Sequence, residues 1–287
     1  MGLPPKEAGQ KHAHQGESRE PRRLRQMGLR RHWAHGKPAN VARPSPTPAG
    51  DTAAALQRRL TALGDAKRAE GAKAYLKSEL SFLGVPVPQI RGEARAFTEA
   101  TPELNHAALW AVVHALWKTR VHELRSLAIA LLERRADLLS TPDMGAVAAL
   151  LRSADTWAHV DWLATKVAGA IVSACPDSAT ALDAWARDSC MWLRRAAMLA
   201  LHDPILRGVG DFQHFSRLAV PMLGEREFFI RKAIGWMLRS AAKRRPDLTE
   251  AFVTAHATSL SALSFREATR NLPPADQARL RALRKTP

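Results

Sequence analysis

Trp157 and Asp161 lie four residues apart in the segment 153–170, SADTWAHVDWLATKVAGA. Residues at positions i and i+4 share one face of a helix, so an indole ring and a carboxylate are expected side by side. Such a pair can stabilise a transient cation by charge and by the electron-rich face of the ring. The alternative is that Asp161 caps or salt-bridges a neighbouring helix beside a tryptophan that only packs. A separate apolar stripe at helical spacing is expected to face a core: Val160, Leu163, Ala164, Val167 and Ala168.

Basic residues share helical faces with tryptophans in two later segments. Trp192 and Arg195 lie three residues apart in 190–203. Arginine can hold a phosphate with two parallel hydrogen bonds, which a solvated lysine cannot do. Three helices that each present an aromatic ring with charge favour a groove that binds a duplex, although a charged stripe can also be only a solvated face. Along one side of 226–244, at steps of three and four, run Lys232, Trp236, Arg239 and Lys243.

The elements that position these residues are expected to be helices throughout. From Thr52 onward apolar residues recur at helical spacing, whereas strand signals are nearly absent, with one Tyr and no Asn-Gly or Asp-Gly turn. We therefore predict an all-α fold. GAKAYLKSELSFL is expected to be a helix that ends at Gly84, and Asp155 is expected to be the N-cap or a first-turn acid of its helix. Further helices are expected at about 103–117, 120–138, 142–152, 155–174, 177–187, 190–203, 211–223, 226–244, 247–257 and 264–284, the last interrupted by Pro273-Pro274.

Three segments share a pattern in which an arginine shortly precedes an Ala-Ile or Ala-Met pair on an apolar face: 123–139, 192–206 and 229–248. Aligning Ala128, Ala168, Ala197 and Ala233 gives spacings of 40, 29 and 36 residues. Irregular spacing favours a solenoid of HEAT-like helical hairpins, with a concave basic DNA-binding face, over a tight repeat. A non-repetitive helical bundle is the alternative.

Charge is the informative bulk property, because the formal net charge of +16 over 287 residues predicts an anionic partner. Residues 1–50 contain ten Lys and Arg against three Glu and so carry +7, which leaves +9 for the rest of the chain. We expect residues 1–51 to be a disordered basic tail with a Pro-rich linker, RPSPTPAGD, and residues 52–287 to be one domain. The tail is either a DNA-tethering arm or a dispensable extension.

The sequence lacks the signals that are typical of several other classes of protein. No apolar run approaches the ~20 residues needed to span a bilayer, and no apolar leader segment opens the chain, so we expect a cytoplasmic, nucleoid-associated protein without membrane contact. Cys175 and Cys190 are the only cysteines, and there is no HExxH, Gly-rich phosphate loop or GxSxG turn. We therefore expect neither a metal nor a cofactor. The Ala/Arg-rich composition hints at a GC-rich bacterial genome.

Five blocks of the sequence occur in the order found in a known family. The match covers about 52–273, and the block FFIRKAIGW is quite specific. On these blocks the chain resembles the AlkD-like family of alkylpurine DNA glycosylases, which are solenoids of HEAT-like repeats that hold duplex DNA on a concave face. The blocks are AYLKSELSFLGVPVPQIR (74–91), TWAHVD (156–161), WLRRAAM (192–198), EFFIRKAIGWMLR (227–239) and LSFREATRNL (263–272).

The resemblance implies a role for individual residues. Trp157 and Trp236 match the two aromatic residues that flank the deoxyribose of the lesion, and Asp161 matches the catalytic carboxylate. Arg195 matches an arginine on the backbone of the lesion strand, Arg239 a nearby phosphate-contacting arginine, and Tyr75 an aromatic position beside the groove. The chain departs from the family at Thr156 and Ala158, where a second Trp and an acid are expected, and this bears on lesion preference.

The implied reaction is hydrolysis of the N-glycosidic bond of N3- or N7-alkylated purines in duplex DNA, without extrusion of the base. An alkylated purine is already a cationic leaving group, so the enzyme has to stabilise an oxocarbenium-like sugar and deliver water. Asp161 would supply fixed negative charge and orient the water. It must stay ionised, so we expect a partly wet site in which Arg195 lowers its pKa.

No lysine is placed as a Schiff-base nucleophile, so we expect a monofunctional glycosylase that acts as a monomer. The alternatives are a non-catalytic HEAT-like binder of branched or damaged DNA and a scaffold for protein interactions.

Overall fold

The structure, a computed structural model, describes residues 48–284. The expected tail therefore lies outside the described residues, except for its last positions, which belong to helix α1 (Pro48–Ala62). The prediction of an extended linker is wrong for residues 48–51, because these residues are helical. Pro48 occupies the first helical position, where a missing N–H costs nothing, and Asp51 in the first turn favours the helix N-terminus.

The all-α fold is confirmed, since within residues 48–284 the only β-type pairing is one isolated bridge between Ser81 and Val121. None of the described helices is long and apolar enough to cross a bilayer. After α1 the α-helices are α2 (Ala66–Leu76), α3 (Val87–Ala100), α4 (His106–Trp117), α5 (His122–Arg134), α6 (Asp143–Arg152), α7 (Trp157–Trp162), α8 (Gly169–Ala174), α9 (Ala179–Trp185), α10 (Met191–Leu199), α11 (His202–Arg207), α12 (Phe212–Ala219), α13 (Phe228–Ala241), α14 (Pro246–Ala255), α15 (Ala262–Thr269) and α16 (Pro274–Leu283). A π-helix covers Leu163–Ala168, and short 3₁₀ turns cover Ala136–Leu138, Pro176–Ser178 and Val220–Met222.

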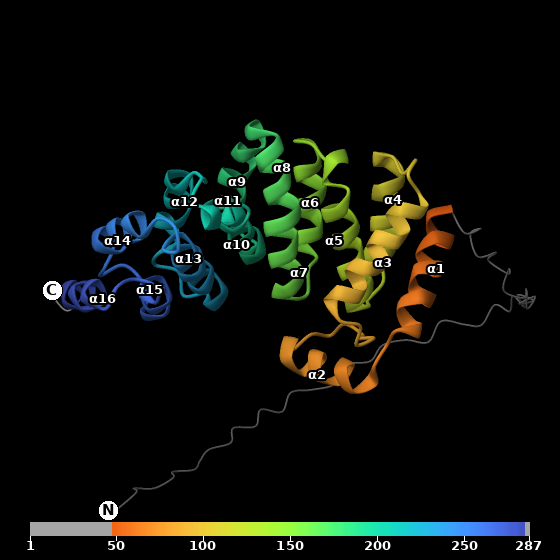
Figure 1. Cartoon of the computed structure of the whole chain (residues 1–287), viewed down its shortest axis with the longest axis horizontal. Helices are drawn as coiled ribbons and strands as arrows, with labels where there is room; N and C mark the ends of the chain where they lie inside the picture. Colours follow the sequence, from red (N-terminus) through yellow and green to blue (C-terminus); the bar gives the residue numbers. More distant parts are fainter. Residues whose placement is uncertain (1–47, 285–287) are drawn as a thin grey trace, which may run out of the picture. The chain divides into compact units, whose positions relative to one another are not determined.

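The described helices form two rows that follow the order of the chain (Figure 1). In one row α3 packs on α5, α5 on α7, α7 on α10, α10 on α13, and α13 on α15. The helices that lie between them in the sequence form the second row. They pack across onto the first row, α4 on α5, α9 on α10, and α14 on α15. The helices of the two rows thus pack against near neighbours in the chain, so the predicted helical solenoid is confirmed.

The largest differences from the predicted helices concern α2 and the segment 190–203. α2 ends at Leu76 and not at Gly84, because Lys77 adopts a left-handed conformation with φ of 49° and its N–H bonds to the carbonyl of Lys73. The expected helix over 190–203 is divided into α10 and α11. The break at Pro273-Pro274 occurs as expected, since α16 begins at Pro274, where a helix tolerates proline.

The turn before α3 is held by a buried carboxylate. Glu123, 2% exposed, accepts hydrogen bonds from the N–H groups of Leu83 at 2.9 Å and Gly84 at 2.8 Å. Gly84 has φ of +79°, and a Cβ atom there would lie 2.0 Å from the carbonyl oxygen of Asp65. The turn therefore requires glycine on two grounds, a left-handed backbone and a close approach of the chain.

Gly84→Ala is expected to lower the free energy of unfolding by about 2–3 kcal/mol, since it adds left-handed strain and a backbone clash. Urea denaturation of both proteins measures the difference. The matched control is Gly92→Ala in the exposed interior of α3, where a Cβ meets nothing within 4 Å and should stabilise the helix by about 0.5–1 kcal/mol. Equal midpoints for the two variants would contradict this account of the turn.

Candidate active site

A cleft of about 800 Å³ opens across the row of helices that contains α7, α10, α13 and α15, with α2 at one end. Almost every residue predicted from the sequence to act at the site lines it: Tyr75, Trp157, Asp161, Arg195, Lys232, Trp236 and Arg239. Lys243 does not, because α13 ends at Ala241 and Lys243 lies in the turn beyond, so the expected helical face stops before it. Positions far apart in sequence thus meet in one cavity.

Trp157 and Asp161 project from one turn of α7, and both line the cleft, as their spacing predicts. The helix continues without a break through the π-helical segment into α8, and the N–H of Gly169 bonds to the carbonyl of Ala164, five residues earlier. The residues of the predicted apolar stripe are fully buried on the other side of this helix: Val160, Leu163, Ala164, Val167 and Ala168. The core therefore fixes the face that carries the indole and the carboxylate.

The N-cap of α7 is Thr156, whose hydroxyl accepts the N–H of His159 at 3.4 Å. Thr156 is 2% exposed. Asp155 was expected to be the N-cap or a first-turn acid, and that expectation is wrong, because its carboxylate pairs instead with Arg125. The departure from the family pattern at Thr156 thus coincides with a structural role, the start of the helix that carries Asp161.

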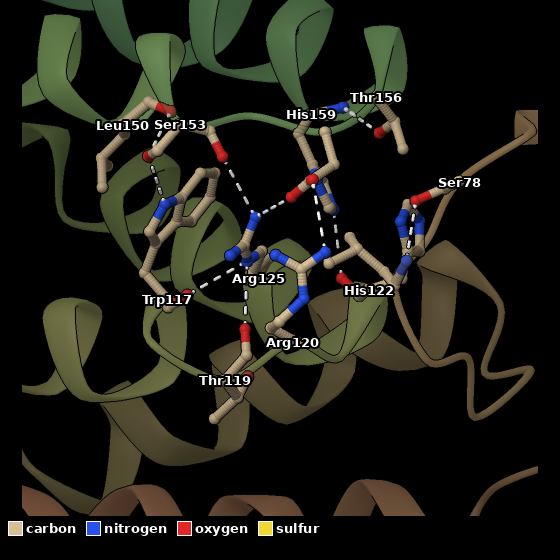
Figure 2. Close-up of polar contacts among 12 residues, drawn as sticks. Ser78, Trp117, Thr119, Arg120, His122, Arg125, Leu150, Ser153, Thr156 and His159 are labelled. Atoms are coloured by element: carbon tan, nitrogen blue, oxygen red, sulfur yellow. Dashed lines mark hydrogen bonds and ion pairs between the residues drawn. The ribbon is translucent and has the colours of Figure 1, made fainter. Parts of the chain in front are cut away.

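Arg125 ties this start to α5 and to the preceding loop (Figure 2). The guanidinium is buried, 6% exposed, and its pKa is lowered by burial even though Asp155 opposes the shift. Besides Asp155, it donates to the backbone carbonyls of Trp117 at 3.0 Å, Thr119 at 3.1 Å and Ser153 at 3.2 Å. The loop that leads into α7 is therefore anchored by one side chain with four acceptors.

Two histidines stack behind the same loop, with the rings of His122 and His159 4.3 Å apart (Figure 2). Burial lowers the pKa of His122 to about 4 and the pKa of His159 well below its usual value. Both rings are therefore neutral at physiological pH. His159 Nε2 lies 3.1 Å from the hydroxyl of Ser126 and 3.1 Å from the carbonyl of His122, which fixes the first turn of α7 against α5.

Asp161 is held by a bidentate ion pair from α10. Arg195 Nε lies 2.7 Å from Asp161 Oδ1, and Nη2 lies 2.9 Å from Oδ2. The side chain of Asp161 is 15% exposed and that of Arg195 is 5% exposed. Burial raises the pKa of Asp161, and the hydrogen bond and charge of Arg195 oppose this rise without cancelling it.

The expectation that Arg195 keeps the pKa of Asp161 low is therefore wrong in its net result, because removal from water outweighs the ion pair. Arg195 still lies where that expectation placed it. Its third hydrogen bond runs from Nη1 to the carbonyl of Phe229 on α13, so this one side chain links three helices. Asp161 thus forms the salt bridge to a neighbouring helix that the structural alternative expected. It also lines the cleft, as the functional interpretation expected.

Aromatic rings form both walls of the cleft. On one side Tyr75, 73% exposed, meets Trp157 edge to face with ring centroids 5.8 Å apart. On the other side Trp192 lies 5.0 Å from Phe229, and Phe228 lies 5.3 Å from Phe229. Large exposed rings are rarely left on a protein surface without a binding role, so these walls are suited to a flat or apolar part of a ligand.

Trp236 is placed by the residue beneath it. Its ring lies 4.7 Å from that of His202, which in turn contacts the hydroxyl of Ser240 at 3.1 Å and Asp203 at 3.0 Å. His202 is 7% exposed, so it contacts Trp236 from the protein interior, while Trp236 itself lines the cleft.

Glu267 on α15 is the residue that the sequence analysis missed. It pairs with Lys232 at 3.1 Å and also with Arg239. Burial acts to raise its pKa, but the hydrogen bond from Lys232 and the charges of both cations outweigh this and lower it. The approach of α15 depends on Gly235, since a Cβ atom there would lie 2.6 Å from the Cβ of Glu267. The sequence block 263–272 held no signal that its acid would face α13.

The described residues offer no group of three or more His, Cys, Asp or Glu side chains that could hold a metal ion. The fold and the cleft define a helical-repeat protein in which carboxylates paired with arginine or lysine lie between aromatic walls. Residues 56–272 match the family described as DNA alkylation repair enzyme, so the chain belongs to that family.

Two solved structures share the fold. A protein described as a "predicted DNA alkylation repair enzyme" from Enterococcus faecalis is 23% identical, with a TM-score of 0.65, over 74% of this chain and 97% of its own. AlkD2 from Streptococcus mutans is 13% identical, with a TM-score of 0.51, over 83% of this chain and 98% of its own. No protein among those with curated functions matches the chain.

Proposed function

We propose that the chain is a monofunctional DNA glycosylase that hydrolyses the N-glycosidic bond of N3- or N7-alkylated purines in duplex DNA and leaves an abasic site. One observation carries the proposal. Asp161, Trp157 and Trp236 line a single cleft together with cationic side chains, in a member of the DNA alkylation repair family. No lysine is required as a nucleophile, because water is the acceptor of the sugar.

The chemistry follows from the charge of the substrate. An N3- or N7-alkylated purine is cationic, so it leaves as a neutral base and the positive charge passes to the sugar. The carboxylate of Asp161 stabilises that developing charge and orients the water that attacks the anomeric carbon. The indoles of Trp157 and Trp236 offer electron-rich faces to the same cation, each contributing ~0.5–2 kcal/mol.

Ionisation of Asp161 is coupled to the substrate. Because its pKa is raised in the free protein, the anion is less favoured there than it would be in water. A cationic base brought into the cleft favours the ionised form by direct attraction, so the carboxylate is best matched to the charged lesions. Cationic lesions should therefore react fastest, which agrees with the proposed substrate class.

The rim of the cleft is suited to the DNA backbone. Lys232 and Arg239 are partly exposed and are proposed to contact phosphates near the lesion, and Tyr75 is proposed to contact the duplex beside the groove. Arg195 uses three of its five N–H groups on Asp161 and Phe229, which leaves two for the backbone of the lesion strand. Contacts to backbone and sugar alone would allow catalysis without extrusion of the base. Lys243, outside the cleft, is proposed as a peripheral phosphate contact.

A second function is a DNA-binding protein without catalysis. The bidentate pair between Asp161 and Arg195 favours it, since a carboxylate neutralised by a neighbouring helix can be purely structural. Exposure of Asp161 to a cleft with two tryptophans favours the enzyme. We also propose that the protein acts as a monomer in a bacterial cytoplasm, in association with the nucleoid; the bacterial origin of both structural relatives supports the source.

Mass spectrometry of the bases freed from methylated duplex DNA tests the proposal. The wild-type protein is expected to release N3- and N7-methylated purines faster than they depart spontaneously. Tight, salt-sensitive binding to the same DNA without any excess release would support the non-catalytic binder.

Glu267→Gln is expected to tighten binding to unmodified duplex DNA by about three- to tenfold, or about 0.7–1.4 kcal/mol. The change removes an anion from a cleft that faces phosphates and frees the two cations that it pairs. Fluorescence anisotropy at fixed salt measures the affinity. Glu225→Gln is the control, because Glu225 pairs with Arg194 and does not line the cleft. Weaker binding by the Glu267 variant would show that Glu267 positions the cations for DNA.

A further inference from the structure

A second cavity, of about 750 Å³, lies between α15 and α16, and four of its nine lining residues are arginines. The charged residues that line it are four arginines and one acid: Arg266, Arg270, Arg281, Arg284 and Glu267. Phe265, Ala262, Thr269 and Gln277 complete its walls. The sequence analysis did not assign a role to any of these arginines.

Within residues 48–284 none of the four arginines forms an ion pair, although the charge of Arg270 acts on nearby Glu267 and helps to lower its pKa. Arg266 lies on α15, and Arg270 is the C-cap residue that follows the helix, four residues later; both are exposed, and neither forms an ion pair among residues 48–284. In the described part of the chain, Arg281 donates to the side-chain oxygen of Gln277, at 3.0 Å, and to no carboxylate. Arginines that gather in this way repel one another, and an anion in the cavity would relieve that repulsion.

Arg284 is held in place by two backbone carbonyls and an aromatic ring. Its Nη1 donates to the carbonyls of Ala257 at 3.2 Å and Leu260 at 2.6 Å, and the guanidinium lies over the ring of Phe265, 5.1 Å from the centroid. It thus brings a fixed positive charge to the wall of the cavity without a carboxylate to neutralise it. A preorganised guanidinium of this kind is well suited to a phosphate.

The second cavity adjoins the first at one shared residue. Glu267 lines both, and it pairs with Lys232 and Arg239 on the side of the candidate active site. The cationic surface therefore runs from α13 across α15 to α16, with a single carboxylate at the junction. A ligand with regularly repeated negative charges could follow the whole path.

We propose that the cavity between α15 and α16 binds backbone phosphates of the same DNA duplex, beyond the nucleotide that occupies the candidate active site. Arg266 and Arg270 contact the phosphates directly, and Arg281 and Arg284 add charge behind them. The inference rests on the proposed function, because that function makes duplex DNA the ligand. It extends the DNA-contacting surface to the C-terminal helices.

The salt dependence of binding tests this site. The double variant Arg266→Gln/Arg270→Gln in the full-length protein is titrated with an unmodified duplex at several salt concentrations. Each phosphate contact contributes about 0.9 to the slope of log affinity against log salt, so the slope is expected to fall by about 1.8. The matched control is Arg187→Gln/Arg217→Gln, which removes two charges from exposed positions that line neither cavity.

An unchanged slope in the α15 variant, or an equal fall in the control, overturns the proposal. Inorganic phosphate, added at constant ionic strength, tests whether the cavity binds a free anion and not the phosphates of DNA. If it raises the melting temperature of the wild type but not of the variant while the slopes agree, the DNA assignment is wrong. Base release is measured separately on methylated DNA, so its absence from the wild type would refute the glycosylase proposal and leave the slope comparison intact.

Discussion

Asp161→Asn is expected to slow the release of methylated purines from duplex DNA by about 10²–10³-fold, which corresponds to about 2.7–4 kcal/mol of lost transition-state stabilisation. Asparagine has nearly the shape of aspartate and can still accept a hydrogen bond from Arg195. It has no negative charge to offer to an oxocarbenium-like sugar, and it is a poor acceptor for a proton from water. Single-turnover release measured by mass spectrometry gives the rate.

The same variant should bind unmodified duplex as well as the wild type or slightly better, because it removes an anion from the cleft. Asp183→Asn is the control, since Asp183 pairs with His214 and does not line the cleft. Wild-type release should fall as the pH is lowered, with a midpoint above 3.8, the ordinary value for an aspartate, since burial raises the pKa of Asp161. Full activity in Asp161→Asn would remove Asp161 from the mechanism.

Arg195→Met is expected to lower the free energy of unfolding at neutral pH by about 3 kcal/mol and to abolish most base release. Methionine fills the space of the aliphatic stem but leaves the carboxylate of Asp161 buried without its bidentate partner. The hydrogen bond and charge of Arg195 both act to lower the pKa of Asp161, so the pKa should rise further in the variant. Urea denaturation and base release measure the two effects.

The sign of the pH dependence follows from this shift. A carboxyl whose pKa is raised on folding binds more protons in the native state than in the unfolded state, so stability falls as the pH rises through the native pKa. The free energy of unfolding that Arg195→Met loses relative to the wild type should therefore be largest at neutral pH and smaller in acid. In the double variant Asp161→Asn/Arg195→Met, the deficit at neutral pH should be smaller than in Arg195→Met alone.

The neighbouring residue provides the control for Arg195. Arg194→Met also breaks an arginine–carboxylate pair on α10, with Glu225 at 2.9 Å, but on the side of the helix away from the cleft. It should leave base release unchanged. Equal loss of release in Arg194→Met and Arg195→Met would indicate that α10 is merely destabilised, with no specific role for the pair with Asp161.

The parts of the site that the sequence predicted are those within single helices. Trp157 and Asp161 share a face because they lie four residues apart, and Lys232, Trp236 and Arg239 follow the same rule on α13. Helical periodicity cannot show that α7 and α13 line the same cleft, since that depends on how α10 packs between them. A groove shared by the three helices was expected from their aromatic and charged residues, and the pairing of Asp161 with Trp236 at one sugar was expected from the family resemblance.

The features that the sequence did not reveal depend on contacts between helices or on helix ends. Glu267 reaches Lys232 because Gly235 lets α15 approach α13 closely, and neither residue type signals such an approach. Lys243 was misplaced because α13 ends two residues earlier. The pKa of Asp161 depends on the balance between burial and pairing, which spacing alone cannot give.

The π-helical segment Leu163–Ala168 lies between Asp161, which lines the cleft, and Gly169, which packs against a neighbouring backbone. Each extra residue in a helical turn rotates everything after it by roughly 100° relative to a regular helix of 3.6 residues per turn. The N-terminal end is therefore free to aim Asp161 outward, while Gly169 faces the backbone of Ala200, which a Cβ atom would approach to 2.7 Å. A homologue without the additional residue would have to give up either the orientation of the carboxylate or the close packing at the glycine.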